Sequence, residues 1–313
     1  MKGATNQSIS APGSGPSSGT SKNEAIWSIG IYTGQTPIDL EPAPGADNPV
    51  ISAEDVSDVQ AEFVADPFMI DVRGTWHMFF EVMNAETHKG EIGLATSADG
   101  LAWSYARIVL KESFHLSYPY VFRLDGEYYM IPETNKSNSI RLYKADRFPD
   151  EWSLAAHLMQ GAWVDCSVFH YEGRWWMFAT PAFSKSSTLE LFHAESIHGP
   201  WRAHPLNPII AANNRIARPA GRVIVNSAGP IRFTQDCHPS YGTRVRAFDV
   251  LDLTPSGYRD REVEPSPVLA GGEHDWNRAG MHHVDAHSVE GGWLACVDGW
   301  RAEAPKGATA DSR

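Results

Sequence analysis

Apolar and polar residues alternate in short segments along most of the chain, and these segments come in pairs joined by tight turns. In "VFRLDGEYYMI", residues 121–131, an Asp-Gly pair separates two alternating segments, which is a strong hairpin signal. The segment "ADPFMIDVRGTWHMFFE", residues 65–81, has the same form around Gly74. The pattern therefore predicts an all-β protein with almost no helix.

Four of these hairpins share one spacing, which indicates an internal repeat. Each has glycine at +8, an aromatic residue at +10, methionine or alanine at +12 and a polar residue at +15, and the starts are Asp66, Tyr118, Asp165 and His283. A fifth phrase, from Arg218 to Asp236, fits if its turn is slightly longer. The intervals between successive starts are similar, and the longest one precedes His283.

A third and a fourth strand-like segment follow each hairpin, as in "EIGLATSADGLAW" after the first one. Four strands per unit at a period near 50 residues are typical of a β-propeller blade, so five units predict a five-bladed propeller over residues 25–302. The segment "AIWSIGIYTG", residues 25–34, is expected to supply the outer strand of the fifth blade and to close the ring. A stack of β-sandwiches is the rival, and the fixed long period argues against it.

Composition narrows the class of protein. A hydrophobic content of 42% supports a sizeable core, while a net charge of -12 disfavours nucleic acid as a partner. No apolar stretch is long enough to span a membrane, and no secretory signal is visible. Cys166, Cys237 and Cys296 lie far apart and suit reduced thiols, so we expect a cytoplasmic protein. Residues 1–24 and 303–313 have the composition of disordered tails.

The repeat also predicts where a site would lie. In a propeller the first strand of each blade borders the axis, and its start shares one face with the end of the second strand. The residues expected to ring this axial mouth are Asp66, Tyr118, Asp165, Arg218 and His283. The side chains at offset +15, or at the equivalent point of the longer phrase from Arg218, are expected one strand further out, and they are Glu81, Glu133, Thr180, Asp236 and Asp298. An aspartate at a strand start can be a mere turn residue, but varied polar residues at equivalent positions favour a ligand site.

Several strings resemble a known family. They include "WSIGIY", "FVADPFM", "LSYPYVF", "ARPAGR", "QDCHPSYG" and "GMHHVDAH". Over about residues 26–300 the chain resembles the N-terminal domain of the plant glucosamine inositolphosphorylceramide transferases and its stand-alone bacterial relatives. More distantly, "ADPFM" and "VDCSVF" resemble the inner-strand aspartates of the five-bladed glycoside hydrolases of families 43, 32 and 68. Both resemblances imply a five-bladed propeller. The glycosyltransferase domain of the plant proteins has no counterpart in this sequence.

The glycosidase resemblance implies catalytic roles. Hydrolysis of a glycosidic bond usually needs two carboxyl groups. The resemblance makes Asp66 the base or nucleophile and Asp165 a supporting or catalytic aspartate. It expects an acidic glutamate at the start of the fourth blade, where this chain has arginines. The acid would then be Glu133 as first choice, Asp236 as second or Glu81 as third.

Other residues are candidates for binding substrate, namely Tyr118, Arg218, Arg222, Asp236, His238, Tyr241, His282, His283 and Glu81. The arginines suit a carboxylate or phosphate on the ligand, and a pairing with Asp236 inside the ring is the alternative. His283, Asp285 and His287 alternate along one strand and could chelate a metal. No cofactor is required. The family-43 resemblance implies a structural calcium at the axis, with His283 beside it through water.

Two functions remain. The leading hypothesis is a carbohydrate-active enzyme of the glycoside-hydrolase type that acts on a small glycoside or sugar conjugate, with an anionic group on the sugar as one option. The rival is a non-catalytic sugar-binding propeller that serves a biosynthetic partner enzyme. The polar ring favours the enzyme, and the missing carboxylate in the fourth blade favours the rival.

Overall fold

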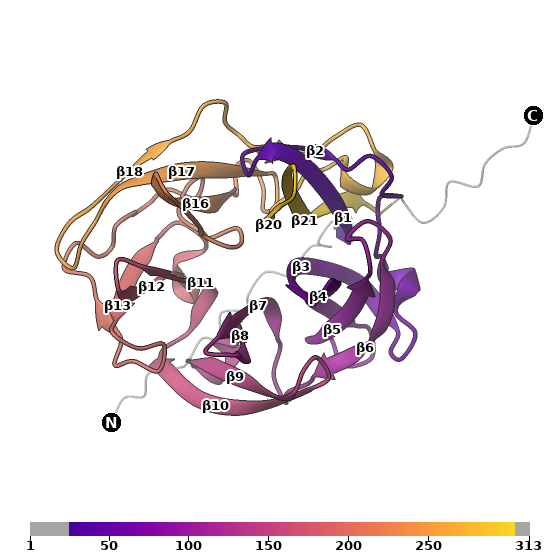
Figure 1. Ribbon diagram of the computed structural model, residues 1–313, viewed down its shortest axis with the longest axis horizontal. Coiled ribbons are helices and arrows are strands. Elements are labelled where there is room, and N and C mark those ends of the chain that lie inside the picture. Colours follow the sequence, from indigo (N-terminus) through magenta and orange to yellow (C-terminus); the bar gives the residue numbers. More distant parts are fainter. Residues whose placement is uncertain (1–24, 304–313) are drawn as a thin grey trace, which may run out of the picture.

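The chain folds as a ring of five sheets in a computed structural model that describes residues 25–303 (Figure 1). The predicted five-bladed all-β propeller is confirmed. The first sheet contains β3 (Ala61–Val72), β4 (Thr75–Asn84), β5 (Lys89–Ser97) and β6 (Ser104–Leu110). The second contains β7 (Ser117–Leu124), β8 (Glu127–Glu133), β9 (Ser139–Arg147) and β10 (Glu151–Gln160). The third contains β11 (Trp163–Tyr171), β12 (Arg174–Pro181), β13 (Glu190–Ala194) and β14 (Arg202–Ala203).

The last two sheets are less regular. The fourth contains β15 (Ile224–Asn226), β16 (Gly229–Asp236), β17 (Arg244–Leu253) and β18 (Tyr258–Glu262), and β19 (Leu269–Ala270) also pairs with β17. The fifth contains β20 (Val284–Val289), β21 (Gly292–Ala302), β1 (Ala25–Thr36) and β2 (Asp39–Pro42). In the described part of the chain the helical segments are short 3-10 turns, η1 (Ala53–Asp55), η2 (Asn135–Ser137), η3 (Ala182–Ser184) and η4 (Asp275–Asn277). None of these segments could span a membrane.

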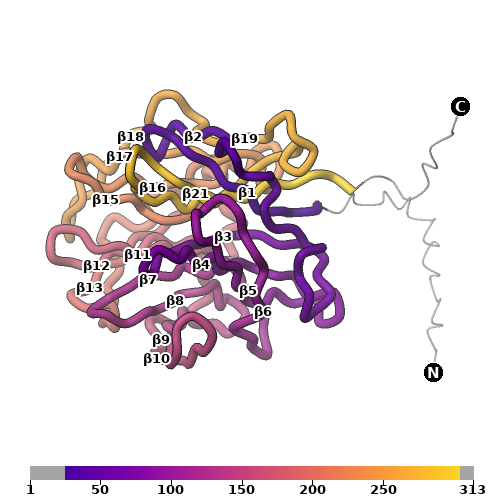
Figure 2. The backbone as a smooth tube through the Cα atoms, turned by 45° about the vertical axis from the view of Figure 1, so that its right-hand side comes forward, coloured from indigo at the N-terminus to yellow at the C-terminus, as the bar shows by residue number. Residues whose placement is uncertain are grey.

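The N-terminal segment closes the ring, as predicted, but in a different place from the one expected. β1 pairs with β21 from Ala25 opposite Ala302 to Gly34 opposite Trp293. The prediction that residues 25–34 form the outer strand is wrong, because β1 is the third strand and β2 lies outside it. The chain turns back after Thr36, so one hairpin supplies both outer positions. Figure 2 shows the indigo N-terminal strand beside the yellow C-terminal one.

Apolar side chains fill the space between neighbouring blades. Met78, Met130 and Met177, which share the +12 position, are all fully buried. The four clusters of buried apolar residues each draw on strands of more than one blade. This packing confirms that the repeated apolar positions form the core and leaves the strand ends for other roles.

The inner strands of the first three blades share an unusual backbone at their starts. Asp66, Tyr118 and Asp165 have φ angles of 53°, 47° and 51°, and each lies at a shift in strand register. Such a left-handed conformation costs of order 1–3 kcal/mol for a residue other than glycine and is common at functional sites. The first three phrases are therefore equivalent in backbone as well as in sequence. Arg218 and His283 are absent from the positive-φ residues of the described chain, so the last two phrases differ.

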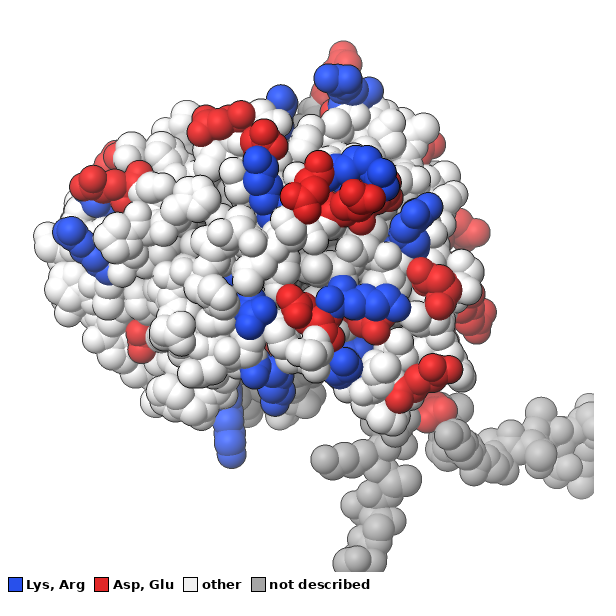
Figure 3. Space-filling model, turned by 90° about the horizontal axis from the view of Figure 1, so that it is seen from below, with Lys and Arg blue, Asp and Glu red and all other residues white. Residues whose placement is uncertain are grey.

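The outer surface carries charges of both signs. Figure 3 shows Lys and Arg side chains interspersed with Asp and Glu over one side of the ring, without a broad basic field. The two predicted tails lie outside the described residues, except for Glu303. All three cysteines are buried and unpaired, as expected.

Candidate functional site

Five carboxyl groups gather where inner strands start and second strands end. Asp66, Glu81, Glu133, Asp165 and Asp298 are at most 6% exposed, and Asp66 influences the charge state of each of the others or is influenced by it. They come from four different blades. We call this set the axial carboxylate cluster. The shared frame predicted this gathering, and five buried carboxyl groups in one place need protons or positive partners.

Asp66 is more than a turn residue. Its backbone N–H donates to Asp298 Oδ2 at 3.0 Å, but among the described residues no group donates a hydrogen bond to its own carboxylate. The nearest partners are His282 Nε2 at 3.7 Å and His283 Nδ1 at 3.8 Å, both beyond hydrogen-bond distance. Burial raises the pKa of Asp66 to about 7, although His282 opposes the shift. A buried carboxyl without donors is available to a ligand.

Asp165 has the opposite surroundings. Nε and Nη2 of Arg218 donate to its two oxygens, and Gln235 Nε2 donates to Oδ2 at 2.7 Å. Gln235 is itself fixed by Pro219 O at 2.9 Å. The guanidinium of Arg218 thus balances Asp165 and also approaches Glu133 Oε2 at 3.9 Å. This bidentate pair compensates the charge of a buried carboxylate.

Glu133 and Glu81 are the two members of the cluster that are candidates for the general acid, a role that requires a protonated carboxyl group. Burial, reinforced by Asp165, raises the pKa of Glu133 well above its usual range, although Arg218 opposes the shift. Asn135 donates to Glu133 Oε1 at 2.7 Å, while Oε2 is buried and has no hydrogen-bond partner among the described residues. Burial also raises the pKa of Glu81 well above its usual range, and Asp66 adds to the effect.

His115 lies against Glu81 and was not predicted. Its Nδ1 accepts the backbone N–H of Gly90 at 2.8 Å, so in the neutral ring the proton is on Nε2. That Nε2 lies 3.3 Å from Glu81 Oε1. Burial lowers the pKa of His115, so a neutral imidazole faces the Glu81 carboxyl group.

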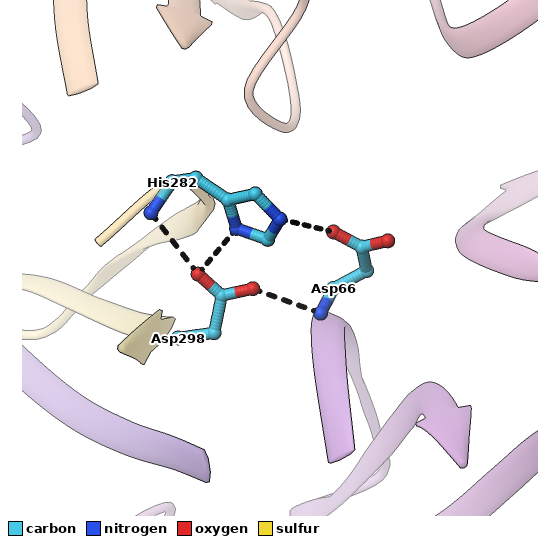
Figure 4. A group of neighbouring side chains, drawn as sticks. All are labelled: Asp66, His282 and Asp298. Atoms are coloured by element: carbon cyan, nitrogen blue, oxygen red, sulfur yellow. Dashed lines mark hydrogen bonds and ion pairs between the residues drawn. The ribbon is translucent and has the colours of Figure 1, made fainter. Parts of the chain in front are cut away.

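His282 is held on three sides. Its Nδ1 donates to Asp298 Oδ1 at 2.8 Å (Figure 4). Its ring stacks on Trp27 with the ring centroids 4.1 Å apart, and Tyr241 meets it edge-on at 5.1 Å. Burial disfavours the charged ring, but the Asp298 carboxylate outweighs burial and raises the pKa of His282. The outer side of this group is more open to solvent, because Tyr241 is 44% exposed. The guanidinium of Arg218 lies over the same Tyr241 ring, 5.1 Å from its centroid.

Tyr118 and His283 lie at the predicted frame positions but pack inside the ring. The Tyr118 hydroxyl contacts Ser167 Oγ at 2.8 Å and accepts the N–H of Gly221 at 2.6 Å, so protein groups occupy it. His283 is fully buried between Phe68 and Tyr118, and both ring nitrogens lack hydrogen-bond partners among the described residues. Burial lowers the pKa of His283 to about 4, which keeps the ring neutral.

Arg222 and Asp285 form a second internal pair. Arg222 Nε donates to Asp285 Oδ1 at 2.6 Å, and its Nη2 donates to Val121 O at 2.9 Å. Asp285 Oδ2 also accepts the N–H of Met69 and lies 3.0 Å from His287 Nε2. Burial alone would raise the pKa of Asp285, but Arg222 and His287 together lower it below its usual value. These contacts bind blades to one another, so His283, Asp285 and His287 do not converge as a metal chelate.

Asp236 and His238 lie apart from the cluster. Nε and Nη2 of Arg246 donate to Asp236 Oδ2 at 2.9 and 2.7 Å, and the backbone N–H of His238 donates to Oδ1 at 3.1 Å. The His238 side chain is exposed. The alternative that Arg218 or Arg222 pairs with Asp236 is wrong. Arg218 pairs with Asp165, and Arg222 pairs with Asp285.

One group of side chains could hold an ion. Ligand atoms of Asp66, His282 and Asp298 lie within 4.8 Å of one another. The hydrogen bond between His282 Nδ1 and Asp298 Oδ1 already accounts for one of these contacts. The calcium expected beside His283 stays a prediction.

The residues that sequence reasoning missed share a cause. Asp298 has the +15 position of the last phrase, but spacing alone did not distinguish it from the equivalent side chains of the other blades. His115, Gln235 and Trp27 lie outside the repeat frame or beside a more conspicuous residue. Their roles depend on contacts between segments that are far apart in the sequence, which the spacing within one segment does not encode.

The fold is a five-bladed propeller that is similar to those of solved carbohydrate-active enzymes. The β-1,2-mannobiose phosphorylase from Listeria innocua matches with a TM-score of 0.61 and 11% identity, covering 85% of this chain and 96% of that chain. Zg3597, a family 117 glycoside hydrolase from Zobellia galactanivorans, matches with a TM-score of 0.54 and 15% identity, covering 87% and 90%. A thermostable family-43 glycoside hydrolase matches with a TM-score of 0.51 and 17% identity, covering 64% and 75%. At these identities the likeness concerns the fold alone.

Sequence comparison assigns the chain to a narrower group than the fold does. Residues 19–300 match the family described as glucosamine inositolphosphorylceramide transferase 1, N-terminal, and the chain belongs to that family. The glucosamine inositolphosphorylceramide transferase 1 of Oryza sativa subsp. japonica is 36% identical over 300 residues, and that of Arabidopsis thaliana is 34% identical over 302. The matches cover 89% of this chain but only 40% and 39% of those proteins.

Proposed function

We propose that the chain is a carbohydrate-active propeller that binds a sugar or sugar conjugate against the axial carboxylate cluster. The observation that carries the proposal is the lack of donors around buried acceptors. Asp66 receives no hydrogen bond to its carboxylate from the described residues, and Glu133 Oε2 has none either. Sugar hydroxyls are donors that would satisfy such oxygens, and convergent polar groups on a rigid frame are typical of ligand sites.

The proposed chemistry is of the glycoside-hydrolase type. Glu133 would act as the general acid, because burial and Asp165 raise its pKa well above the usual range and so favour the protonated form. Asp66 would act as the base or nucleophile. Asp165, held by Arg218 and Gln235, would orient the ligand and tune its neighbours. Glu81 is the alternative acid, since the pKa of its carboxyl group is raised as well.

The charge balance favours a neutral or cationic sugar over an anionic one. Arg218 and Arg222, the groups expected to recognise an anion, are each paired with an aspartate. The remaining carboxyl groups of the cluster would favour an ammonium group. The relatives are named for a transferase of glucosamine, an amino sugar, so a glucosaminide is the first ligand to test.

The second candidate is a non-catalytic sugar-binding module in a cytoplasmic protein that serves a biosynthetic enzyme. The start of the fourth blade supports it, because that position carries Arg218 and no carboxylate. The matches cover only 40% and 39% of the named relatives, so most of each relative lies outside the matched region. A transferase activity there would need only a sugar-recognition site here.

A paired assay separates the two candidates. Aryl glycosides, including the glucosaminide, are screened for hydrolysis, and binding of the free sugars is measured by calorimetry. The variant is Asp66→Asn, and Asp236→Asn is the control because it lies at a frame position outside the cluster. Turnover lost only in Asp66→Asn supports the enzyme, while binding without turnover supports the module. A wild type that neither binds nor cleaves any sugar would refute both candidates.

A further inference from the structure

Asp298 makes contacts within the site that the sequence did not predict. It is fully buried, and both of its oxygens accept hydrogen bonds (Figure 4). Oδ1 accepts from His282 twice, from the backbone N–H at 3.2 Å and from Nδ1 at 2.8 Å. Oδ2 accepts the backbone N–H of Asp66 at 3.0 Å. One carboxylate thus joins the last blade to the first at the point where both contribute to the cluster.

The bond to Asp66 distinguishes this residue from its equivalents. Tyr118 and Asp165 have the same left-handed backbone, and the blades before them carry Glu81 and Glu133 at the position equivalent to Asp298. Neither glutamate accepts the N–H of the next blade's first residue in the described chain, whereas Asp298 does. Because Asp298 takes the Asp66 N–H, the Asp66 carboxylate need not fold back on its own backbone.

The bond to His282 fixes a ring that has little room to turn. A carboxylate only accepts, so Nδ1 of His282 carries the hydrogen and Nε2 is directed toward Asp66 Oδ1 at 3.7 Å. Trp27 stacks on one side of the ring, and the edge of Tyr241 meets it from another direction. The orientation of Nε2 is therefore set by Asp298 and by these two aromatic rings.

We propose that Asp298 is a positioning residue of the axial site, which anchors the backbone N–H of Asp66 and aims His282 Nε2 at the Asp66 carboxylate. The inference rests on the proposed function, which supplies the ligand that Asp66 and His282 would face. It requires a carboxylate, because both oxygens act as acceptors at once. An amide has one acceptor oxygen, so asparagine would keep one of the two connections and place an N–H₂ group against the other donor.

The first test reads the hydrogen bond directly and needs no ligand. In ¹⁵N-edited NMR of histidine side chains, the wild type should show a protected, downfield Nδ1 proton that disappears in His282→Gln. Asp298→Asn should lose or shift this signal. Asp236→Asn is the matched control, because Asp236 is equally buried at the same repeat position but bonds Arg246. A wild type without the proton overturns the inference, even if Asp298→Asn does not fold.

The second test measures the affinity for the ligand. Asp298→Asn should weaken binding of the sugar found in the screen at least ten-fold relative to wild type. Asp236→Asn should stay within about two-fold of the wild-type affinity, even where its melting temperature falls as far as that of Asp298→Asn. Equal affinity in Asp298→Asn and wild type, with the proton signal unchanged, would contradict the positioning role. If the wild type binds no sugar, the proposed function fails, and the NMR comparison still decides whether Asp298 orients His282.

Discussion

At the scale of single residues, Asp66 shows how burial shifts the pKa of an aspartate at the start of a strand toward neutral pH. Its pKa rises to about 7 from the usual value of 3.8, mainly because burial disfavours the charge. A carboxyl group with a raised folded-state pKa stabilises the fold when protonated, and this contribution is lost as the pH rises from about 4 to 7. At neutral pH and above, a shift of this size corresponds to a penalty of up to about 4 kcal/mol.

The first prediction follows from that sign. Asp66→Asn removes the charge, and asparagine tolerates the left-handed backbone at φ 53°. The variant should melt several degrees above wild type at pH 8, with the difference shrinking toward pH 5, as measured by calorimetry in a pH series. Asp236→Asn should melt below wild type at pH 8, since it removes the charge of one of the two carboxylates paired with Arg246, the other being Glu262. An Asp66→Asn protein less stable than wild type at pH 8 would contradict the assigned charge state.

The second prediction concerns Glu133. If it is the general acid, Glu133→Gln should lower kcat for an aryl glycoside with a poor leaving group about 100-fold and leave KM nearly unchanged. Glutamine can still accept the hydrogen bond of Asn135, so the local structure should persist. Glu81→Gln is the matched comparison, because Glu81 also has a raised pKa. A larger loss in Glu81→Gln would transfer the acid role to that residue.

Residue-level prediction from sequence succeeded where the repeat frame applied. Asp66 and Asp165 could be placed together because equal phase in successive blades implies equal position around the ring. The partners of Arg218 and Arg222 could not be predicted. Each arginine reaches a carboxylate of a different blade, and several acidic residues were equally plausible from spacing alone.

At the scale of elements, the fourth blade departs from the repeat for a visible reason. Its inner strand begins only at Ile224, and the preceding Gly221 forms a parallel bridge to Val284 of β20. A Cβ at Gly221 would lie 1.8 Å from Val284 O, and its φ is 129°. The Tyr118 hydroxyl accepts its N–H from the other side. The longer phrase from Arg218 was visible in the sequence, but this contact between blades was not.

The third prediction uses this glycine. Gly221→Ala should destabilise the protein by about 3 kcal/mol or more, because a backbone carbonyl cannot yield and the φ angle is unfavourable. Gly126→Ala is the control, since Gly126 also has a positive φ, 87°, but has open space around its Cβ position. That change should cost about 1 kcal/mol. Urea denaturation measures both, and equal costs would show that the contact with β20 does not matter.

At the scale of the whole molecule, the ring is closed by a strand far away in sequence. β1 lies between β21 and β2, and its central residues, including Ile29 and Ile31, are fully buried. The sequence predicted this closure because the last phrase lacked further strands. The exact position within the blade was missed, since an apolar segment of this length fits either a third or an outer strand.

The fourth prediction tests the closure. A chain that starts at residue 37 lacks β1, so β21 would present an unpaired edge and the apolar side chains packed on β1 would be exposed. Such a chain should aggregate or lose its cooperative thermal transition, whereas a chain that starts at residue 24 should melt like the full one. Light scattering and calorimetry measure these outcomes.

A separate peptide provides the control for this truncation. Adding residues 24–44 to the shortened chain should restore part of the transition, because the strand pairs through its backbone and through side chains that are buried against the ring. A chain without β1 that stays monomeric and melts normally would mean that the ring does not depend on this strand. The hydrogen bonds from the first blade to Asp298 and Asp285, which accept the N–H groups of Asp66 and Met69, would then hold the last blade to the first.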